Sequence, residues 1–335
     1  MNVVTGSTSW LRKLCVGTSP VVLFTGLFLG APQSAVAAEL ELDCASRPAK
    51  CGYPSNRNSG LKKKVRRTTA DGRRIVREVR FQTIPDEVRS GPGWRWDSRG
   101  FVQINGDETV FKNFIVKGTV DVLADNVVIK NVRVLVGGES FGIALRRADN
   151  TKIKRCFVGP AKGERRLMVG IKDIYGDAQN TKIIRCNIYG TSTGIQIGRG
   201  RIVRNFIHDL RYESGDHLNG ITSNGSTGHL LVKRNTIFNS HDQTDAIGLF
   251  QDFGIEANRT IVGNLVAGGG YTIYGGEGSG DRSSYNIKIT NNRFSNIFYN
   301  RSGYYGHGTA FNRRGDGNVW SDNFWDHNGR SVPVP

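Results

Sequence analysis

One hexad of alternating apolar and polar residues recurs along the chain. Its clearest copies begin at Ile129, Ile153, Ile183, Ile202, Val232, Ile261 and Ile289, and weaker copies begin at Phe111 and Trp320. A small residue followed by isoleucine lies between copies, as in Gly142-Ile143, Gly170-Ile171, Gly194-Ile195, Gly220-Ile221, Ala246-Ile247 and Thr272-Ile273. Each repeat therefore predicts three short strands joined by loops and a tight bend, with almost no helical periodicity.

A repeat of 18 to 31 residues is too small to bury its own apolar face. Successive repeats must therefore stack and bury a continuous core between them. This predicts an all-β parallel solenoid of about nine coils over residues 101–335, with neighbouring coils about 4.8 Å apart.

The fourth hexad position supports the stacking. Asparagine is poor in strands, but stacked asparagines can hydrogen-bond from coil to coil as a ladder. The predicted ladder residues are Asn205, Asn235, Asn264, Asn292 and Asn323. Cys156 and Cys186 occupy the same position one coil apart, either as buried thiols or as a disulfide.

Three stretches carry a resemblance to a known group of proteins: DNVVIKNVRV (125–134), GDHLNGI (215–221) and GGGYTIYGG (268–276). With the asparagine ladder, they resemble secreted right-handed parallel β-helix proteins of the pectate-lyase-like superfamily. The resemblance implies a right-handed β-helix and a carbohydrate partner. That superfamily includes lyases, hydrolases, epimerases and non-catalytic tailspikes or adhesins. Its His-x-Asp-Gly-Ile motif is matched by His217-Leu-Asn219-Gly-Ile, with an amide in place of the acid.

Residues 1–38 are predicted to be a signal peptide. Arg12 and Lys13 precede a short apolar run (21–30), and Ala35-Val36-Ala37 forms a cleavage site. The run is too short to span a membrane comfortably, and no later segment is long and apolar enough to do so. We therefore expect a secreted, extracellular protein.

Residues 39–100 do not follow the repeat and are predicted to form an N-terminal cap with a basic segment. Cys44 and Cys51 flank a short loop and are predicted to form a disulfide in an oxidising compartment. A cap is expected because an open solenoid end exposes unpaired backbone groups.

The chain has 46 lysine and arginine residues against 29 acids, a net charge of +17. Such a surface attracts polyanions. The third hexad position places Arg155, Arg185, Arg204 and Arg234 on four coils, either as a solvated stripe or as a strip that docks polysaccharide. Nucleic acid is not an expected partner because no recognition helix or ribonucleoprotein motif occurs. We expect a monomer.

Two similar stretches, GDHLNGI (215–221) and HDQTDAI (241–247), predict one candidate site. Aligning the small-residue–isoleucine steps places Asn219, Asp245 and Tyr271 in one outward column. Thr222, Gly248 and Tyr274 form a second column, which Lys172 and Gln196 extend. The loops that precede these strands add Asp216, His217, His241, Asp242 and Gln243. The alternative is that these are ordinary turn residues.

Three functions suit this patch. β-Elimination on an acidic polysaccharide needs a base, for which His217, Lys172 or a tyrosine is available, and a cation such as calcium on Asp216, Asp242 and Asp245. Glycoside hydrolysis needs two carboxyl groups, here Asp245 with Asp242 or Asp216. A non-catalytic surface would bind sugars by stacking and hydrogen bonds. The predicted substrate-binding residues are Gln196, Asn219, Thr222, Tyr271, Tyr274 and Gln243.

Overall fold

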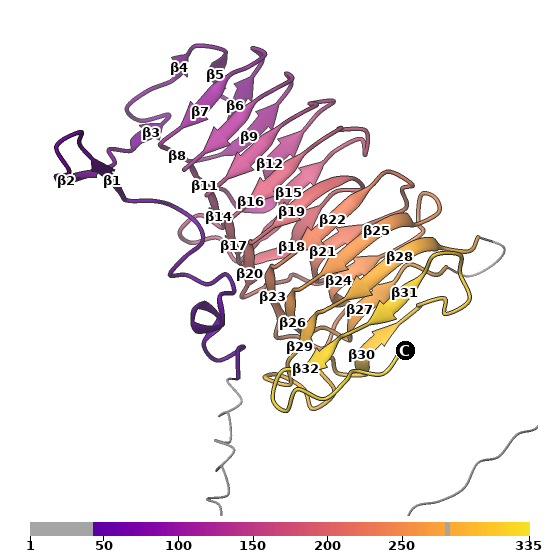
Figure 1. The fold of residues 1–335 in the computed structure, drawn as a ribbon. Coiled ribbons are helices and arrows are strands. Elements are labelled where there is room, and N and C mark those ends of the chain that lie inside the picture. The colour runs from indigo at the N-terminus through magenta and orange to yellow at the C-terminus, as the bar shows by residue number, and fades with distance from the viewer. Residues whose placement is uncertain (1–42, 279–281) are drawn as a thin grey trace, which may run out of the picture. The chain divides into compact units, whose positions relative to one another are not determined.

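Three long sheets form a parallel β-helix in the computed structural model, which describes residues 43–278 and 282–335 (Figure 1). Each coil contributes one strand to each sheet in turn. Nine strands of the repeat stack in the first sheet, so the predicted solenoid of about nine coils is confirmed. The predicted signal peptide lies outside the described residues.

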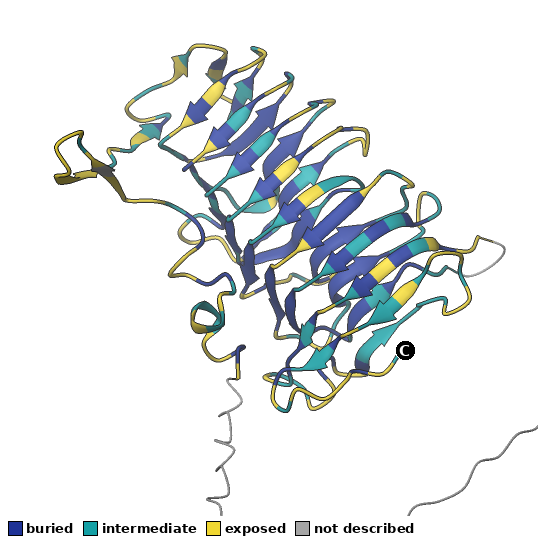
Figure 2. Ribbon diagram, in the orientation of Figure 1, coloured by how far each residue is buried: buried dark blue, intermediate teal, exposed yellow. Residues whose placement is uncertain are grey.

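Sheet 1 contains the first half of every hexad. Its strands are β7 (Val110–Lys112), β10 (Val128–Lys130), β13 (Lys152–Lys154), β16 (Lys182–Ile184), β19 (Gly200–Val203), β22 (Leu230–Lys233), β25 (Ala257–Val262), β28 (Tyr285–Thr290) and β31 (Val319–Ser321). Exposed residues alternate with buried ones along several of these strands (Figure 2).

Sheet 2 contains the second half of every hexad. Its strands are β3 (Gln82–Ile84), β8 (Phe114–Val116), β11 (Arg133–Leu135), β14 (Phe157–Gly159), β17 (Asn187–Tyr189), β20 (Phe206–His208), β23 (Thr236–Asn239), β26 (Leu265–Gly268), β29 (Arg293–Phe294) and β32 (Phe324–Trp325).

Sheet 3 contains the small-residue–isoleucine steps. Its strands are β4 (Ser90–Gly91), β5 (Trp94–Asp97), β6 (Phe101–Ile104), β9 (Thr119–Val122), β12 (Gly138–Leu145), β15 (Leu167–Asp173), β18 (Thr191–Gln196), β21 (Asn219–Ser223), β24 (Asp245–Leu249), β27 (Tyr271–Gly275) and β30 (Gly306–Thr309). β4, β5 and β6 pair antiparallel at the N-terminal end of this sheet.

Equal positions of the repeat are direct neighbours. Ile129, Ile153, Ile183 and Ile202 pair in succession along sheet 1 and are fully buried. The isoleucines of sheet 3 pair in the same way, from Ile143 to Ile273. The small residue before each isoleucine also faces a crowded interior. A Cβ atom at Gly170 would lie 2.6 Å from the Gly194 carbonyl oxygen and 2.8 Å from Ile188.

The asparagine ladder is confirmed at the bend between sheets 1 and 2. The Nδ2 atom of Asn205 donates to Oδ1 of Asn235 at 3.0 Å, and the same bond links Asn235 to Asn264. The ladder continues through Asn292 to Asn323. Cys156 and Cys186 extend the column as buried free thiols.

The first part of the described N-terminal segment lies along the side of the solenoid, and a later part lies at its end. Residues 43–62, named the tether here, run along sheet 2 from the last coil toward the first (Figure 1). The Ala45 N–H donates to Asp326 at 2.8 Å, Asn187 donates to Asn56 at 2.7 Å, and the Lys62 N–H donates to Asn131 at 2.6 Å. Later in the segment, β3, β4 and β5 lie at the N-terminal ends of sheets 2 and 3, where a cap is expected.

A disulfide stiffens the beginning of the tether. Cys44 and Cys51 are joined as predicted, with Cα atoms 5.7 Å apart, around the short 3₁₀ helix η1 (Pro48–Cys51). Cys44 packs in a small apolar cluster with Phe206 and Phe238 of sheet 2. After the tether, β1 (Lys64–Thr68) and β2 (Arg74–Glu78) form an antiparallel hairpin. No helix among the described residues is long and apolar enough to cross a membrane.

Candidate functional site

The two predicted columns lie side by side on the outer part of sheet 3. In the first, Thr193 pairs with Asn219, and Asn219 pairs with Asp245. The second, named the lysine column here, runs through Lys172, Gln196, Thr222, Gly248 and Tyr274. The Asn219–Asp245 pair and the lysine column have the register that the repeat predicts, because parallel strands in register place equal positions next to one another.

Asp245 is the most unusual residue of this face. We expected an exposed carboxylate, but the residue is fully buried and neither of its carboxyl oxygens has a hydrogen-bond partner among the described residues. Burial raises the pKa of Asp245 well above its ordinary value, because an unpaired charge is costly away from water. The geometry therefore favours a neutral carboxylic acid at this position.

Glycine and aromatic residues enclose this carboxyl group. A Cβ atom at Gly248 would collide both with Oδ2 of Asp245 and with the ring of Phe250. The Phe250 ring lies 5.1 Å from that of Tyr274. Burial raises the pKa of Tyr274, and ionisation of the nearby Asp245 would raise it further. Gly248 therefore leaves space that the carboxyl group and the phenylalanine share.

Asn219 adds a second polar group beside Asp245. Its Nδ2 atom donates to Thr193 Oγ1 at 3.3 Å, whereas its buried Oδ1 atom has no partner in the described chain. The neighbouring strand thus places an unpartnered amide oxygen beside an unpartnered carboxyl group.

Tyrosines gather next to Asp245, on the C-terminal side of the face. The ring centroids of Tyr271 and Tyr274 are 5.7 Å apart, and those of Tyr271 and Tyr305 are 5.6 Å apart. Tyr304 lies 4.9 Å from Tyr305, and both are at least half exposed. These rings offer the apolar faces on which sugar rings stack.

Lys172 does not meet Asp245. The lysine column places Lys172 three strands before Gly248, which lies on the same strand as Asp245. Three strands correspond to about 14 Å along the sheet. The Nζ atom of Lys172 lies 5.2 Å from the centre of the Phe141 ring, and burial lowers its pKa. The two residues share a face, but one sugar linkage cannot contact both.

Asp216 belongs to a buried ion pair that the sequence did not reveal. Nε and Nη2 of Arg166 donate to its two oxygens at 2.8 and 3.0 Å, and Ser192 donates at 2.6 Å. Burial alone would raise the pKa of Asp216, but the bonds from Arg166 and Ser192 lower it. Arg166 is 1% exposed and lies outside every repeat motif, so no pattern pointed to it.

The other predicted residues lie in the loops around this face. His217 and Asp242 are exposed. Gln243 donates to the Asp216 carbonyl oxygen at 3.0 Å, and His241 contacts the Leu210 carbonyl oxygen at 2.8 Å.

The predicted calcium ligands do not form a cluster. No three histidine, cysteine or acidic side chains come close enough to hold a metal within residues 43–278 and 282–335. The oxygens of Asp216 already bind Arg166, and Asp245 is enclosed and unpaired. The set of Asp216, Asp242 and Asp245 is therefore not a calcium site in this structure.

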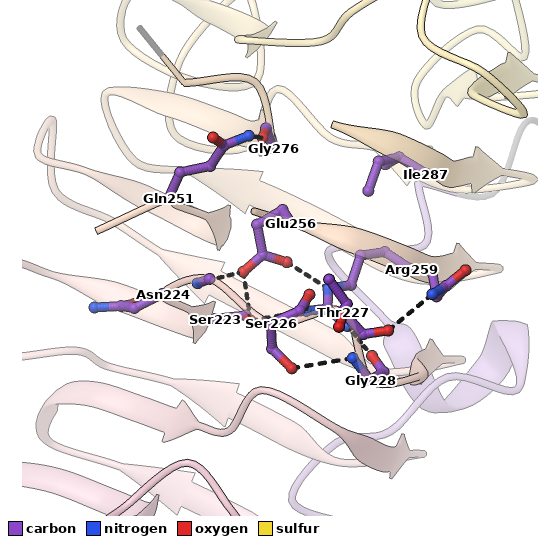
Figure 3. A network of polar contacts seen from close by, with 12 residues as sticks. Ser223, Asn224, Ser226, Thr227, Gly228, Gln251, Glu256, Arg259, Gly276 and Ile287 are labelled. Carbon is purple, nitrogen blue, oxygen red and sulfur yellow. Dashed lines mark hydrogen bonds and ion pairs between the residues drawn. The ribbon is translucent and has the colours of Figure 1, made fainter. Parts of the chain in front are cut away.

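A second buried ion pair holds the loops that leave this face (Figure 3). Glu256 and Arg259 are both fully buried and bonded to each other. Glu256 accepts hydrogen bonds from Ser223 Oγ at 2.6 Å and from the Gly225 N–H at 2.7 Å. Arg259 donates to the carbonyl oxygens of Ser226 and Gly228. This network fixes the chain directly after β21, the strand that carries Asn219 and Thr222.

Comparison with known protein families, curated proteins and solved structures finds no match to this chain.

Proposed function

We propose that the outer face of sheet 3 binds an acidic polysaccharide and cleaves it by β-elimination near Asp245. The observation that carries the proposal is the buried Asp245 carboxyl, which has a raised pKa and lies beside Asn219 and the tyrosine cluster. Strongly perturbed acids are concentrated at functional sites. A structural role alone would normally give such a carboxyl group a hydrogen-bond partner.

Elimination at a uronic acid residue suits these groups. The base removes the proton on the carbon beside the sugar carboxylate, a carbon–carbon double bond forms, and the bond from the sugar ring to the glycosidic oxygen breaks. The leaving oxygen takes up a proton from water or from the protonated base. Negative charge grows on the carboxylate during this step, so neutral donors aimed at it lower the barrier. A protonated Asp245 and the amide of Asn219 are such donors, and neither repels an anionic substrate.

The base is assigned to His217 or to Tyr271. His217 is exposed and lies two residues before Asn219, and Tyr271 begins the strand that follows Asp245 in the sheet. Substrate must displace an aromatic side chain to reach the Asp245 carboxyl. Side-chain rotamer changes of this kind are common on binding, and the half-exposed tyrosines allow them.

Hydrolysis is the second candidate function, because a protonated carboxyl is also the general acid that glycosidases use. Asp242 would then be the second carboxyl group. We further propose that the protein acts outside the cell. The sequence of residues 1–38 and the Cys44–Cys51 disulfide support this location.

The test is cleavage of a panel of uronic acid polysaccharides, followed by ultraviolet absorbance and by reducing ends. We expect both signals to rise with the wild type, and we expect the Asp245→Ala variant, which has no donor at this position, to lose at least about a hundredfold in rate, the scale of one transition-state donor. Asp242→Asn, an exposed acid three residues away, is the matched control and should retain activity. A chelator should leave the rate unchanged.

Each other outcome has a definite meaning. Reducing ends without absorbance would replace elimination by hydrolysis. Full activity in Asp245→Ala would remove Asp245 from the mechanism. Binding of the polymers without any cleavage would show a binding protein instead of an enzyme.

A further inference from the structure

A basic groove lies away from sheet 3, between the tether, the β1–β2 hairpin and the bend that joins sheets 1 and 2. It has a volume of about 640 Å³. Its eleven lining residues include six cations and no acid. The cations are Lys62, Lys112, Lys130, Lys154, Arg155 and Arg185.

The cations are stacked by the fold. Lys112, Lys130 and Lys154 pair directly on three consecutive strands of sheet 1. Such neighbours are about 4.8 Å apart, a separation at which two unit charges repel by roughly 0.9 kcal/mol even in water. Like charges directly opposite each other destabilise a sheet.

No acid of the described chain offsets this repulsion. None of the six cations forms an ion pair with any residue in ranges 43–278 and 282–335. The mutual repulsion of these cations lowers the pKa of two of the lysines. The charge of Arg155 is the largest cause of the lowered pKa of Lys62, and burial followed by Lys152 and Lys130 lowers the pKa of Lys154.

The tether completes the groove and is held in place there. Buried Asn131 accepts from the Lys62 N–H at 2.6 Å and donates to its carbonyl oxygen at 3.1 Å. The Gly60 N–H donates to the Arg185 carbonyl oxygen at 2.8 Å. The fold therefore adds a sixth cation to a surface that already carries five, which is the opposite of what stability alone favours.

We propose that this groove binds a polysaccharide that carries an anionic group on successive sugars. Its rows of cations repeat with the spacing of the strands, which is of the order of the length of one sugar residue. Val65, Val79 and Ile184 add apolar walls for the sugar rings. This site is separate from Asp245, and the inference does not depend on the reaction proposed there.

A single-stranded nucleic acid is the main competing ligand, because it is also a regular polyanion. Grooves that bind it combine cations with aromatic platforms for the bases. None of the eleven lining residues is aromatic, which favours the glycan.

The experiment measures the affinity of the full chain for dextran sulfate and for unmodified dextran. Dextran sulfate contains no uronic acid, so it is not a substrate for elimination. The groove variant is K112Q/K130Q/K154Q, and the matched control is K50Q/K288Q/R314Q, which removes three exposed cations elsewhere. Thermal unfolding of each variant reports on folding, and the groove variant should be at least as stable as the wild type because repulsion is removed.

We expect dextran sulfate but not dextran to bind the wild type, with affinity that falls as salt rises. The groove variant should bind at least about tenfold more weakly, and the control should bind like the wild type. Equal affinity of the two variants would overturn the proposal, as would tighter binding of a single-stranded DNA oligonucleotide. A chain that binds dextran sulfate through this groove but cleaves no uronic acid polymer would fail the proposed function and retain this inference.

Discussion

At the scale of residues, the environment of Asp245 decides its chemistry. The same side chain in Asp242 lies on an exposed loop and is open to water. Here the neighbouring strands, Gly248 and Phe250 exclude water and supply no donor. The pKa is raised because ionisation would place a charge where nothing solvates it.

This protonation can be measured through stability. Asp245 loses its proton near its ordinary pKa in the unfolded chain and only at a higher pH in the folded chain. The folded state therefore binds the extra proton, and its stabilising effect is lost as pH rises through the raised pKa, at up to about 1.4 kcal/mol per pH unit. We expect urea unfolding to show this loss in the wild type and not in Asp245→Asn. An identical pH dependence in both proteins would show that the carboxyl is ionised when folded.

At the scale of elements, the bend between sheets 1 and 2 is built by one repeated pair of residues. The third hexad residue adopts a left-handed conformation, for example φ 58° at Arg204 and 53° at Arg234, which is costly for a side chain with a Cβ. The following asparagine offsets this cost by bonding to both neighbouring coils. Asn264 accepts from the backbone and side chain of Asn235 and donates to Val232 and Asn292.

Removal of one ladder amide should therefore destabilise the fold without touching the proposed site. We expect Asn264→Ala to lower the free energy of unfolding by about 1–3 kcal/mol, since buried donors lose their acceptor. Lys288→Ala, an exposed change on the adjacent coil, should have little effect. Denaturant unfolding of both variants measures the difference. Equal stabilities would show that the ladder contributes no net free energy.

At the scale of the whole described unit, the tether links coils that are far apart in the sequence. A solenoid otherwise consists of nearest-neighbour contacts, so its ends can open separately. Asp326 in the last coil binds the Ala45 N–H and Arg293, while Asn131 in the second coil binds Lys62. The tether therefore adds contacts that a simple stack lacks.

Detachment of the tether at one end should change where the solenoid opens. We expect Asp326→Ala to increase hydrogen exchange of amides in β29 and β32, because the terminal coil loses its outer contact, while β14 and β17 stay protected. Native-state exchange measured residue by residue tests this. A uniform increase across all coils would instead show that the solenoid opens as one unit.

The sequence by itself determined the coil repeat, the ladder and the two columns of sheet 3. Because the coils stack in register, residues at equal positions of the repeat, such as Asn219 and Asp245, lie next to each other on adjacent strands. The spacing of the repeat in the sequence therefore predicts which residues are in contact. Tertiary structure alone decided the burial of Asp245, the Arg166–Asp216 pair and the path of the tether. These three features depend on loops of unequal length that follow no period. They also depend on residues far apart in the sequence, such as Lys62 and Asn131, that come into contact only after folding.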